Sequence, residues 1–206
     1  IWKYSEEEDL YDYELEHFGA GGDKYLGGEN IIKELENAGY EAYIVGGCVR
    51  DSIMGINPKD WDITTSALPQ DIKRVFKRTI DTGIKHGTVS VLINKSTYEI
   101  TTYRIDGEYG DGRHPNSVEF STSLEEDLKR RDFTINAMAY SHKDGLIDLF
   151  DGIKDIKAKR INCVGKAIER FDEDALRMLR AFRFSSKLGF EIENVKSCKI
   201  CGCVGI

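Results

Sequence analysis

The sequence predicts an α+β fold, with a first lobe that mixes helices and strands and a second lobe that is helical. Three observations lead to this prediction. Apolar, β-prone stretches recur up to residue 150 and are separated by glycine-containing turns. Helical patterning takes over after residue 151 and is strongest over 167–188. The 206 residues, 40% of them hydrophobic, suffice for one good core or two small ones.

The first helix of the mixed lobe is expected from Asn30, a suitable N-cap, to Gly39, with Ile31, Ile32 and Leu35 on one face. The elements expected after it, in chain order, are a strand over 40–45, a helix over 48–54, a strand over 60–64, a helix over 69–78, two strands over 87–94 and 97–105, a mobile loop over 106–117, a helix over 124–140 and a strand over 146–150.

Four segments follow from this reading of the chain. They are an acidic N-terminal segment (1–28), the mixed lobe (29–150), the helical lobe (151–193) and an atypical tail (194–206). Cys198, Cys201 and Cys203 in the tail have poor spacing for zinc and no evident fourth ligand, which favours a truncated or frame-shifted end. Because the chain begins with isoleucine, we expect it to be processed or a fragment.

Composition excludes some classes of function. The net charge of −7 argues against a uniformly basic nucleic-acid binder, although a local basic face is compatible with it. Five cysteines at irregular spacing do not predict a disulfide framework, so we expect a reducing, cytoplasmic setting. No apolar run is long enough to cross a membrane and no signal peptide is apparent. We therefore expect no membrane partner, and the sequence leaves the oligomeric state open.

The most informative feature is a pair of aspartates on either side of a tryptophan, Asp60-Trp61-Asp62. Residues two apart on a strand share a face, so the carboxylates converge while Trp61 turns toward the core. Neighbouring carboxylates stay ionised when a cation lies between them, and oxygen ligands favour magnesium or manganese. Glu99, on a later strand, is a candidate third carboxylate, although an ordinary exposed strand residue has the same pattern.

A diglycine, Gly46-Gly47, lies between a predicted strand and a predicted helix. This places free backbone N–H groups where an anion can bind, and Arg50 can add a charge-assisted contact to a triphosphate. No Gly-Lys-Ser/Thr follows, so the motif is not a P-loop. A simple tight turn explains the glycines equally well. Taken with the aspartates, they indicate metal-dependent transfer of a nucleotidyl group.

A second candidate site lies on the predicted helix over 167–188. Asp174 and Arg177 are three residues apart, and Arg180 and Arg183 continue the stripe. A solvated face of ion pairs is the common explanation of such a pattern. The alternative is base recognition, because cytosine and adenine both present an amino donor beside a ring-nitrogen acceptor. An aspartate beside an arginine would accept these bases and reject uracil and guanine.

Between the two candidate sites lies Arg130-Arg131-Asp132-Phe133-Thr134-Ile135-Asn136-Ala137. Arg131 is a candidate phosphate ligand and Asp132 can accept a hydrogen bond from a ribose hydroxyl. Phe133, Ile135 and Ala137 are expected in the core. A charged helix cap ahead of a buried segment is the alternative explanation.

These motifs, in this order, resemble one known family over roughly residues 30–193. Gly-Gly-x-Val-Arg-Asp, Asp-Trp-Asp, Glu-Ile-Thr-Thr-Tyr-Arg, Arg-Arg-Asp-Phe-Thr-Ile-Asn-Ala and Glu-Asp-x-x-Arg are similar to motifs of the class II CCA-adding tRNA nucleotidyltransferases, relatives of bacterial poly(A) polymerases. The resemblance implies a polymerase-β-like nucleotidyltransferase head, with a mixed, mostly antiparallel sheet and helices, followed by a helical neck. It also implies template-independent addition of C, C and A to the 3′ end of tRNA from CTP and ATP.

The resemblance implies roles for individual residues as well. Asp60 and Asp62 would bind metal ions, Mg²⁺ or alternatively Mn²⁺, with Glu99 as the third catalytic carboxylate. The residues implied to contact the nucleotide are Gly46, Gly47, Arg50, Arg131, Asp132, Asp174, Arg177, Arg180 and Arg183. Among these, Asp174 and Arg177 would read the base. The loop around 106–115 corresponds to a flexible loop linked to the switch from C to A addition.

The chain departs from the family pattern at its end. Members normally continue into body and tail domains that hold the tRNA, whereas this chain ends soon after the neck. Two alternatives therefore stay open. One is a poly(A) polymerase or an enzyme adding only part of CCA, although segment 81–89 looks more like the CCA-adding enzymes. The other is a catalytically idle RNA- or nucleotide-binding fragment.

Overall fold

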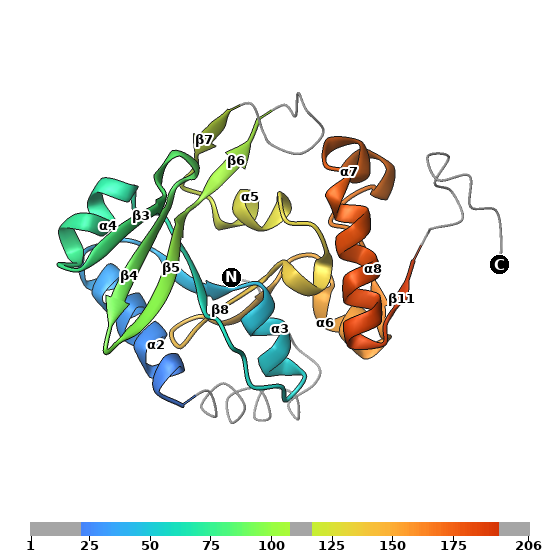
Figure 1. Ribbon diagram of the computed structural model, residues 1–206, viewed down its shortest axis with the longest axis horizontal. Helices are drawn as coiled ribbons and strands as arrows, with labels where there is room; N and C mark the ends of the chain where they lie inside the picture. The colour runs from blue at the N-terminus through green and yellow to red at the C-terminus, as the bar shows by residue number, and fades with distance from the viewer. Residues whose placement is uncertain (1–21, 108–116, 194–206) are drawn as a thin grey trace.

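The computed structural model describes residues 22–107 and 117–193. Figure 1 shows a sheet flanked by helices and, at the other end of the molecule, helices α7 (Ala167–Glu173) and α8 (Leu176–Leu188). The predicted α+β class, with a mostly antiparallel sheet followed by a helical neck, is confirmed. Within the described ranges, no helix combines the length and apolar character needed to cross a membrane.

The main sheet has seven strands in the order β3-β4-β5-β2-β1-β8-β9. Their bounds are β1 Ala42–Val45, β2 Asp62–Thr65, β3 Thr79–Gly83, β4 Thr88–Ile93, β5 Ser96–Thr102, β8 Met138–Ser141 and β9 Gly145–Asp148. All neighbouring strands run antiparallel except β2 and β5, which are parallel. This parallel pair brings Asp62, the first residue of β2, opposite Glu99 in the middle of β5.

The remaining elements connect and cover this sheet. Two small sheets pair β6 with β7 and β10 with β11. The bounds of these elements are α2 Gly22–Asn37, α3 Gly47–Ile53, α4 Pro69–Val75, the 3₁₀ turn η1 Ile84–His86, β6 Arg104–Asp106, β7 Val118–Phe120, α5 Leu124–Lys129, the 3₁₀ turn η2 Thr134–Asn136, α6 Gly152–Lys157, β10 Arg160–Ile161 and β11 Glu191–Ile192.

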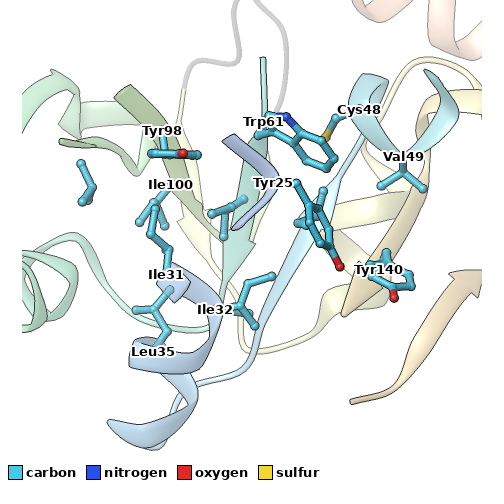
Figure 2. Packing of buried hydrophobic residues seen from close by; sticks show 14 of the residues in the cluster. Tyr25, Ile31, Ile32, Leu35, Cys48, Val49, Trp61, Tyr98, Ile100 and Tyr140 are labelled. Atoms are coloured by element: carbon cyan, nitrogen blue, oxygen red, sulfur yellow. The ribbon is translucent and has the colours of Figure 1, made fainter. Parts of the chain in front are cut away.

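The largest hydrophobic cluster lies between one face of the sheet and helix α2. Ile31 and Leu35 on α2 pack toward Ile100 of β5, as Figure 2 shows. The rings of Tyr25 and Trp61 meet in the same cluster, with centroids 5.3 Å apart. Strand β1 contributes Ile44 here, while alternate residues of β1 face a second cluster on the opposite side of the sheet. The sheet is therefore covered on both faces.

A third and smaller cluster joins the mixed lobe (29–150), from here on the head, to the helical lobe (151–193), from here on the neck. It contains Phe133, Ile135, Ile161, Ala181 and Phe190, each at most 4% exposed. Ala181 comes from α8, and Phe133 and Ile135 come from the Arg-Arg-Asp-Phe-Thr-Ile-Asn-Ala block, which confirms that this block supplies core residues. Helix α8 is thus held against the head by apolar contacts as well as by the polar contacts described below.

The predicted helix over 124–140 is wrong. Helix α5 ends at Lys129, and Met138–Ser141 is strand β8, which lies between β1 and β9 in the sheet. All four residues of β8 are buried. A run that is buried on every side carries neither the two-residue nor the 3.6-residue period, so its pattern does not separate strand from helix. Tertiary pairing decides it.

Two further expectations need correction at their boundaries. Helix α2 begins at Gly22 instead of Asn30, although Gly27 and Gly28 disfavour a helix there. Gly27 faces the Tyr98 side chain so closely that an added Cβ would collide with it, so the missing side chain permits this packing. The predicted helix over 69–78 ends at Val75, and strand β3, which was not predicted, follows it.

The long helix expected over 167–188 is interrupted. Helix α7 ends at Glu173, and Asp174 has an extended backbone with φ −143° and ψ 104°. Helix α8 then starts at Leu176, whose backbone N–H donates to Asp174 Oδ1 at 2.9 Å. Asp174 and Arg177 therefore do not share one continuous helical face. The short strands and helices predicted over 40–45, 48–54, 87–94 and 146–150 are confirmed within a few residues. The single strand predicted over 97–105 is wrong in its second part, because β5 ends at Thr102 and β6 belongs to another sheet.

Candidate active site

The diglycine turn links β1 to α3. Gly46 has φ +85° and ψ −132°, a conformation that a residue with a Cβ rarely adopts. A Cβ built on Gly46 would lie 3.3 Å from a guanidinium nitrogen of Arg131, and one on Gly47 would lie 3.5 Å from a guanidinium nitrogen of Arg50. Two cationic side chains therefore border the turn. The structure thus brings the diglycine, Arg50 and Arg131 together.

The two aspartates lie at the start of β2. Trp61 is only 3% exposed and packs in the main core, whereas Asp60 and Asp62 are both exposed. The alternation expected from the sequence is thus confirmed. The strand itself begins at Asp62, however, so Asp60 precedes it and does not lie within it as expected. The two carboxylates are placed by the burial of Trp61 between them.

Asp62 is electrostatically coupled to its surroundings. Desolvation by the surrounding protein raises its pKa above the usual range, the nearby Arg131 guanidinium lowers it, and Glu99 and Asp60 raise it further. The pKa of Asp62 therefore depends on both of the other candidate carboxylates and on Arg131, which borders the diglycine turn. These four side chains come from three separate parts of the chain, and the fold brings them into one region.

No three His, Cys, Asp or Glu side chains in the described part of the chain lie close enough together to hold a metal ion. Asp60, Asp62 and Glu99 are thus neighbours without forming a ready three-ligand cluster. The donor set still fits a hard divalent cation, because all its ligand atoms are carboxylate oxygens and like charges disfavour one another without a cation. Magnesium typically takes one or two carboxylates and completes its shell with water and substrate phosphates.

A buried carboxylate that the sequence reading missed supports Arg131. Asp127 is fully buried and accepts hydrogen bonds from Arg130, from Arg131 at 3.1 Å and from Thr64 of β2 at 3.0 Å. Burial alone would raise the pKa of Asp127, but the guanidinium groups of Arg131 and Arg130 outweigh it and lower the pKa. The spacing of three and four residues on a helix was the available signal.

A chain of polar contacts connects the head to α8. Asp132 Oδ2 accepts from Arg180 Nε at 2.6 Å, and Asp132 Oδ1 accepts from the Asn136 side-chain amide at 3.3 Å. The other end of the Asn136 side chain accepts from Arg50. Asp132, Arg180 and Arg50, three predicted nucleotide contacts, are thus brought together. Asn136 and Phe184, which lies beside both arginines, were missed by the sequence reading.

The neck holds the candidate base-reading residues in a second group. Arg177 is buried, and one of its guanidinium nitrogens donates to Glu173 at 2.6 Å and to the Arg170 carbonyl at 3.0 Å. Arg170 in turn donates to the Arg131 carbonyl at 2.9 Å, which ties α7 to the head. Arg183 is exposed on α8.

The structure therefore places the three predicted groups on two parts of the fold, which the contact of Arg170 with the Arg131 carbonyl connects. Arg131 acts on the pKa of Asp62, and Arg50 borders the same diglycine turn as Arg131. Arg180 reaches Arg50 through Asp132 and Asn136. Asp174 and Arg177 belong to the neck, where Glu173 contacts Arg177. A hollow beside Glu173 is lined by residues of β6, α5 and α7 and by Arg130, which follows α5. Loop residues 108–116 and the tail cysteines lie outside the described residues.

Residues 42–162 match the family model described as the Poly A polymerase head domain. The chain belongs to this family. Over 170 residues it is 56% identical to a CCA-adding enzyme from Latilactobacillus sakei, a match that covers 82% of this chain and 43% of that protein. Over 163 residues it is 59% identical to a CCA-adding enzyme from Lacticaseibacillus paracasei, covering 79% of this chain and 41% of that protein.

Solved structures agree with these relatives. The CCA-adding enzyme of Bacillus stearothermophilus in complex with CTP has a TM-score of 0.74 at 50% identity, covering 80% of this chain and 40% of that one. The Thermotoga maritima CCA-adding enzyme complexed with tRNA-CCA has a TM-score of 0.69 at 28% identity. This match covers 88% of this chain and 42% of that one. The resemblance to CCA-adding enzymes expected from the motifs is confirmed. The chain spans less than half the length of these relatives.

Proposed function

We propose that this chain carries the catalytic head and the start of the neck of a CCA-adding tRNA nucleotidyltransferase. Its substrates would be CTP, ATP and the 3′ end of tRNA, and its setting the cytoplasm. One observation carries the proposal. The parallel pairing of β2 and β5 places Asp62 opposite Glu99, and Arg131, which borders the diglycine turn, acts to lower the pKa of Asp62. An acidic site beside arginines suits a metal-bound triphosphate, and the similar proteins are named for CCA addition.

Asp60 and Asp62 would hold the divalent metal that nucleotidyltransferases of this kind generally use, with Glu99 as a further carboxylate. Mg²⁺ is the expected ion and Mn²⁺ the substitute. When bound, the metal would favour ionisation of the attacking tRNA hydroxyl and offset charge on the departing pyrophosphate. Arg50 and Arg131 would orient the phosphates over Gly46 and Gly47, where the backbone permits close approach.

The neck would select the base. Asp174 would accept from the amino group of cytosine or adenine while Arg177 donates to the ring nitrogen. The contact between Glu173 and Arg177 supports this, because it holds the guanidinium of Arg177 in one orientation. Arg180 and Arg183 would contact the nucleotide from α8, and Asp132 would be a weaker ribose contact. Uracil and guanine would leave these polar groups unpaired, which is costly in a desolvated site.

The test is incorporation of each labelled NTP, with magnesium, onto tRNA that ends in the discriminator base, in C or in CC. Ordered addition of C, C and then A is the expected result. Long homopolymer tails from ATP alone would instead establish a poly(A) polymerase, and arrest after CC a partial enzyme. Binding of CTP and ATP without any addition would mark a catalytically idle fragment. Asp60→Ala is the matched inactive control, because Asp60 is exposed and its loss spares the core.

A further inference from the structure

A closed circuit of contacts crosses the junction between head and neck. Arg50 of α3 contacts Asn136, Asn136 contacts Asp132, and Asp132 contacts Arg180 of α8. The circuit closes through Phe184, because the guanidinium carbons of Arg50 and Arg180 lie over its ring at 5.2 and 5.5 Å from the centroid. One aromatic ring of the neck is therefore shared by one arginine from each lobe.

Each arginine in this circuit also has its own anion. Arg50 is 3% exposed and pairs with Asp51, and Arg180 pairs with Asp132. These carboxylates reduce the repulsion between two guanidinium groups over the same ring. An aromatic face attracts a cation through the charge distribution of the ring. This contact does not use up the N–H donors of an arginine, so they stay available for a phosphate. Both arginines can therefore keep contact with the ring while hydrogen-bonding elsewhere.

The position of the Phe184 ring is itself fixed by a contact with the buried core residue Phe133. Phe184 meets Phe133 edge-to-face, with centroids 5.8 Å apart and planes at 84°, and Phe133 is only 1% exposed. This is a favoured aromatic geometry, so the core orients the ring that the arginines contact. Arg50 meanwhile borders Gly47 of the proposed phosphate site. The ring thus connects the head–neck core to an arginine of that site.

We propose that Phe184 is a positioning residue for nucleotide binding. Its ring holds Arg50 of the head and Arg180 of the neck beside each other, so that both lobes face one nucleoside triphosphate. This inference rests on the proposed function, in which both arginines contact the nucleotide. Phe184 acts through the arginines and does not itself touch the substrate.

The test is calorimetric binding of CTP and of ATP to the wild-type chain and three variants, followed by steady-state kinetics wherever incorporation occurs. Phe184→Leu keeps an apolar side chain against Phe133 but removes the ring. We expect it to weaken binding of both nucleotides about tenfold and to raise KM similarly with kcat changed little. Phe184→Tyr keeps the ring and should restore binding. Phe182→Leu is the matched control, because Phe182 is an exposed phenylalanine on the same helix.

The outcomes separate this inference from the proposed function. Nucleotide binding that is equal in the wild type and Phe184→Leu overturns the positioning role and leaves the function standing. Equal loss of binding in Phe184→Leu and Phe184→Tyr, or a loss of kcat at unchanged KM, also overturns it. A wild-type chain that binds neither CTP nor ATP overturns the proposed function and this inference with it. Thermal unfolding of all variants verifies that the comparison is made between folded proteins.

Discussion

The main sheet core and the head–neck junction are held together by different kinds of contact. The sheet core buries apolar side chains such as Ile31, Ile63 and Ile100, all at most 1% exposed. The junction has a smaller apolar cluster and adds directional contacts between arginines, carboxylates and an aromatic ring. Apolar burial is non-directional and tolerates volume-conserving change, whereas charged hydrogen bonds depend on geometry.

The two regions differ in whether the residues that stabilise the fold are also the proposed nucleotide contacts. In the sheet core, the residues that stabilise the fold are not the proposed site residues, which lie exposed at the start of β2. At the junction, Arg50, Asp132 and Arg180 both connect the lobes and are proposed nucleotide contacts. Substitutions at the sheet should therefore separate stability from activity, and substitutions at the junction should alter both.

The largest expected effects differ in kind between the neighbouring residues Asp60 and Trp61, the first on activity and the second on stability. Asp60→Ala should lower nucleotide incorporation about a thousandfold or more, about 4 kcal/mol in activation free energy, because it removes a proposed metal ligand. Its thermal unfolding should match the wild type. Trp61→Ala should instead destabilise the fold by roughly 3–5 kcal/mol through a core cavity. Incorporation assays and urea unfolding of both variants check this, and full activity of Asp60→Ala would refute the metal assignment.

Asp127→Asn tests a buried ionic group in the head. Because two arginines lower the pKa of Asp127, its ionised form stabilises the folded state. Removing the charge should destabilise the protein by about 3 kcal/mol at pH 7. The stabilisation is present above the ordinary aspartate pKa and is lost as pH falls through the lower folded pKa, so the difference between the two proteins should shrink in acid.

Urea unfolding over a pH series measures this difference. Asp81→Asn is the control, because the Asp81–Lys73 pair is exposed on both sides and should contribute at most about 1 kcal/mol. Equal effects of the two substitutions would show that burial of Asp127 carries no special weight.

Asp174→Asn probes the neck without removing its local hydrogen bond. An asparagine oxygen can still accept from the Leu176 backbone N–H, so the start of α8 should be kept. The change to a side-chain amide should weaken the preference for CTP and ATP over UTP and GTP about tenfold to a hundredfold. Competition assays with all four nucleotides measure the preference. Unchanged selectivity would exclude Asp174 from base reading.

Two adjacent glycines in α2 give a stability test of the sheet core. Gly27→Ala should cost about 1–3 kcal/mol, because the added Cβ collides with Tyr98. At Gly28 the nearest atom to an added Cβ is Ile44 Cδ1 at 4.0 Å, so Gly28→Ala should be neutral or stabilising by up to about 1 kcal/mol. Urea unfolding of both variants decides whether α2 packs as closely as described.

The smallest expected effect concerns Asp62. Its raised pKa means that the folded state binds more protons than the unfolded state between the ordinary and the raised pKa, so stability falls as pH rises through that window. Asp62→Asn should therefore be more stable than the wild type above the window, by less than about 1 kcal/mol because solvent screens a partly exposed group. The advantage should vanish below the ordinary aspartate pKa. A stability loss at pH 7 would contradict the raised pKa.

The sequence by itself determined the features that depend on neighbouring residues. The alternation of residue types predicted that Asp60 and Asp62 are exposed on either side of a buried Trp61. The diglycine predicted the turn between strand β1 and helix α3. The ordered motifs predicted the family. Helical spacing of three and four residues also places Asp127 beside Arg130 and Arg131.

Tertiary structure alone decided the features that depend on distant residues. Strand β8 is buried on all sides, so its period was uninformative, and its pairing with β1 and β9 made it a strand. The parallel register that sets Asp62 opposite Glu99 joins strands that are separated along the chain. The ring of Phe184 meets Arg50 only because α8 packs against the head. Local pattern determines which way a side chain faces, and packing between distant segments determines what it meets there.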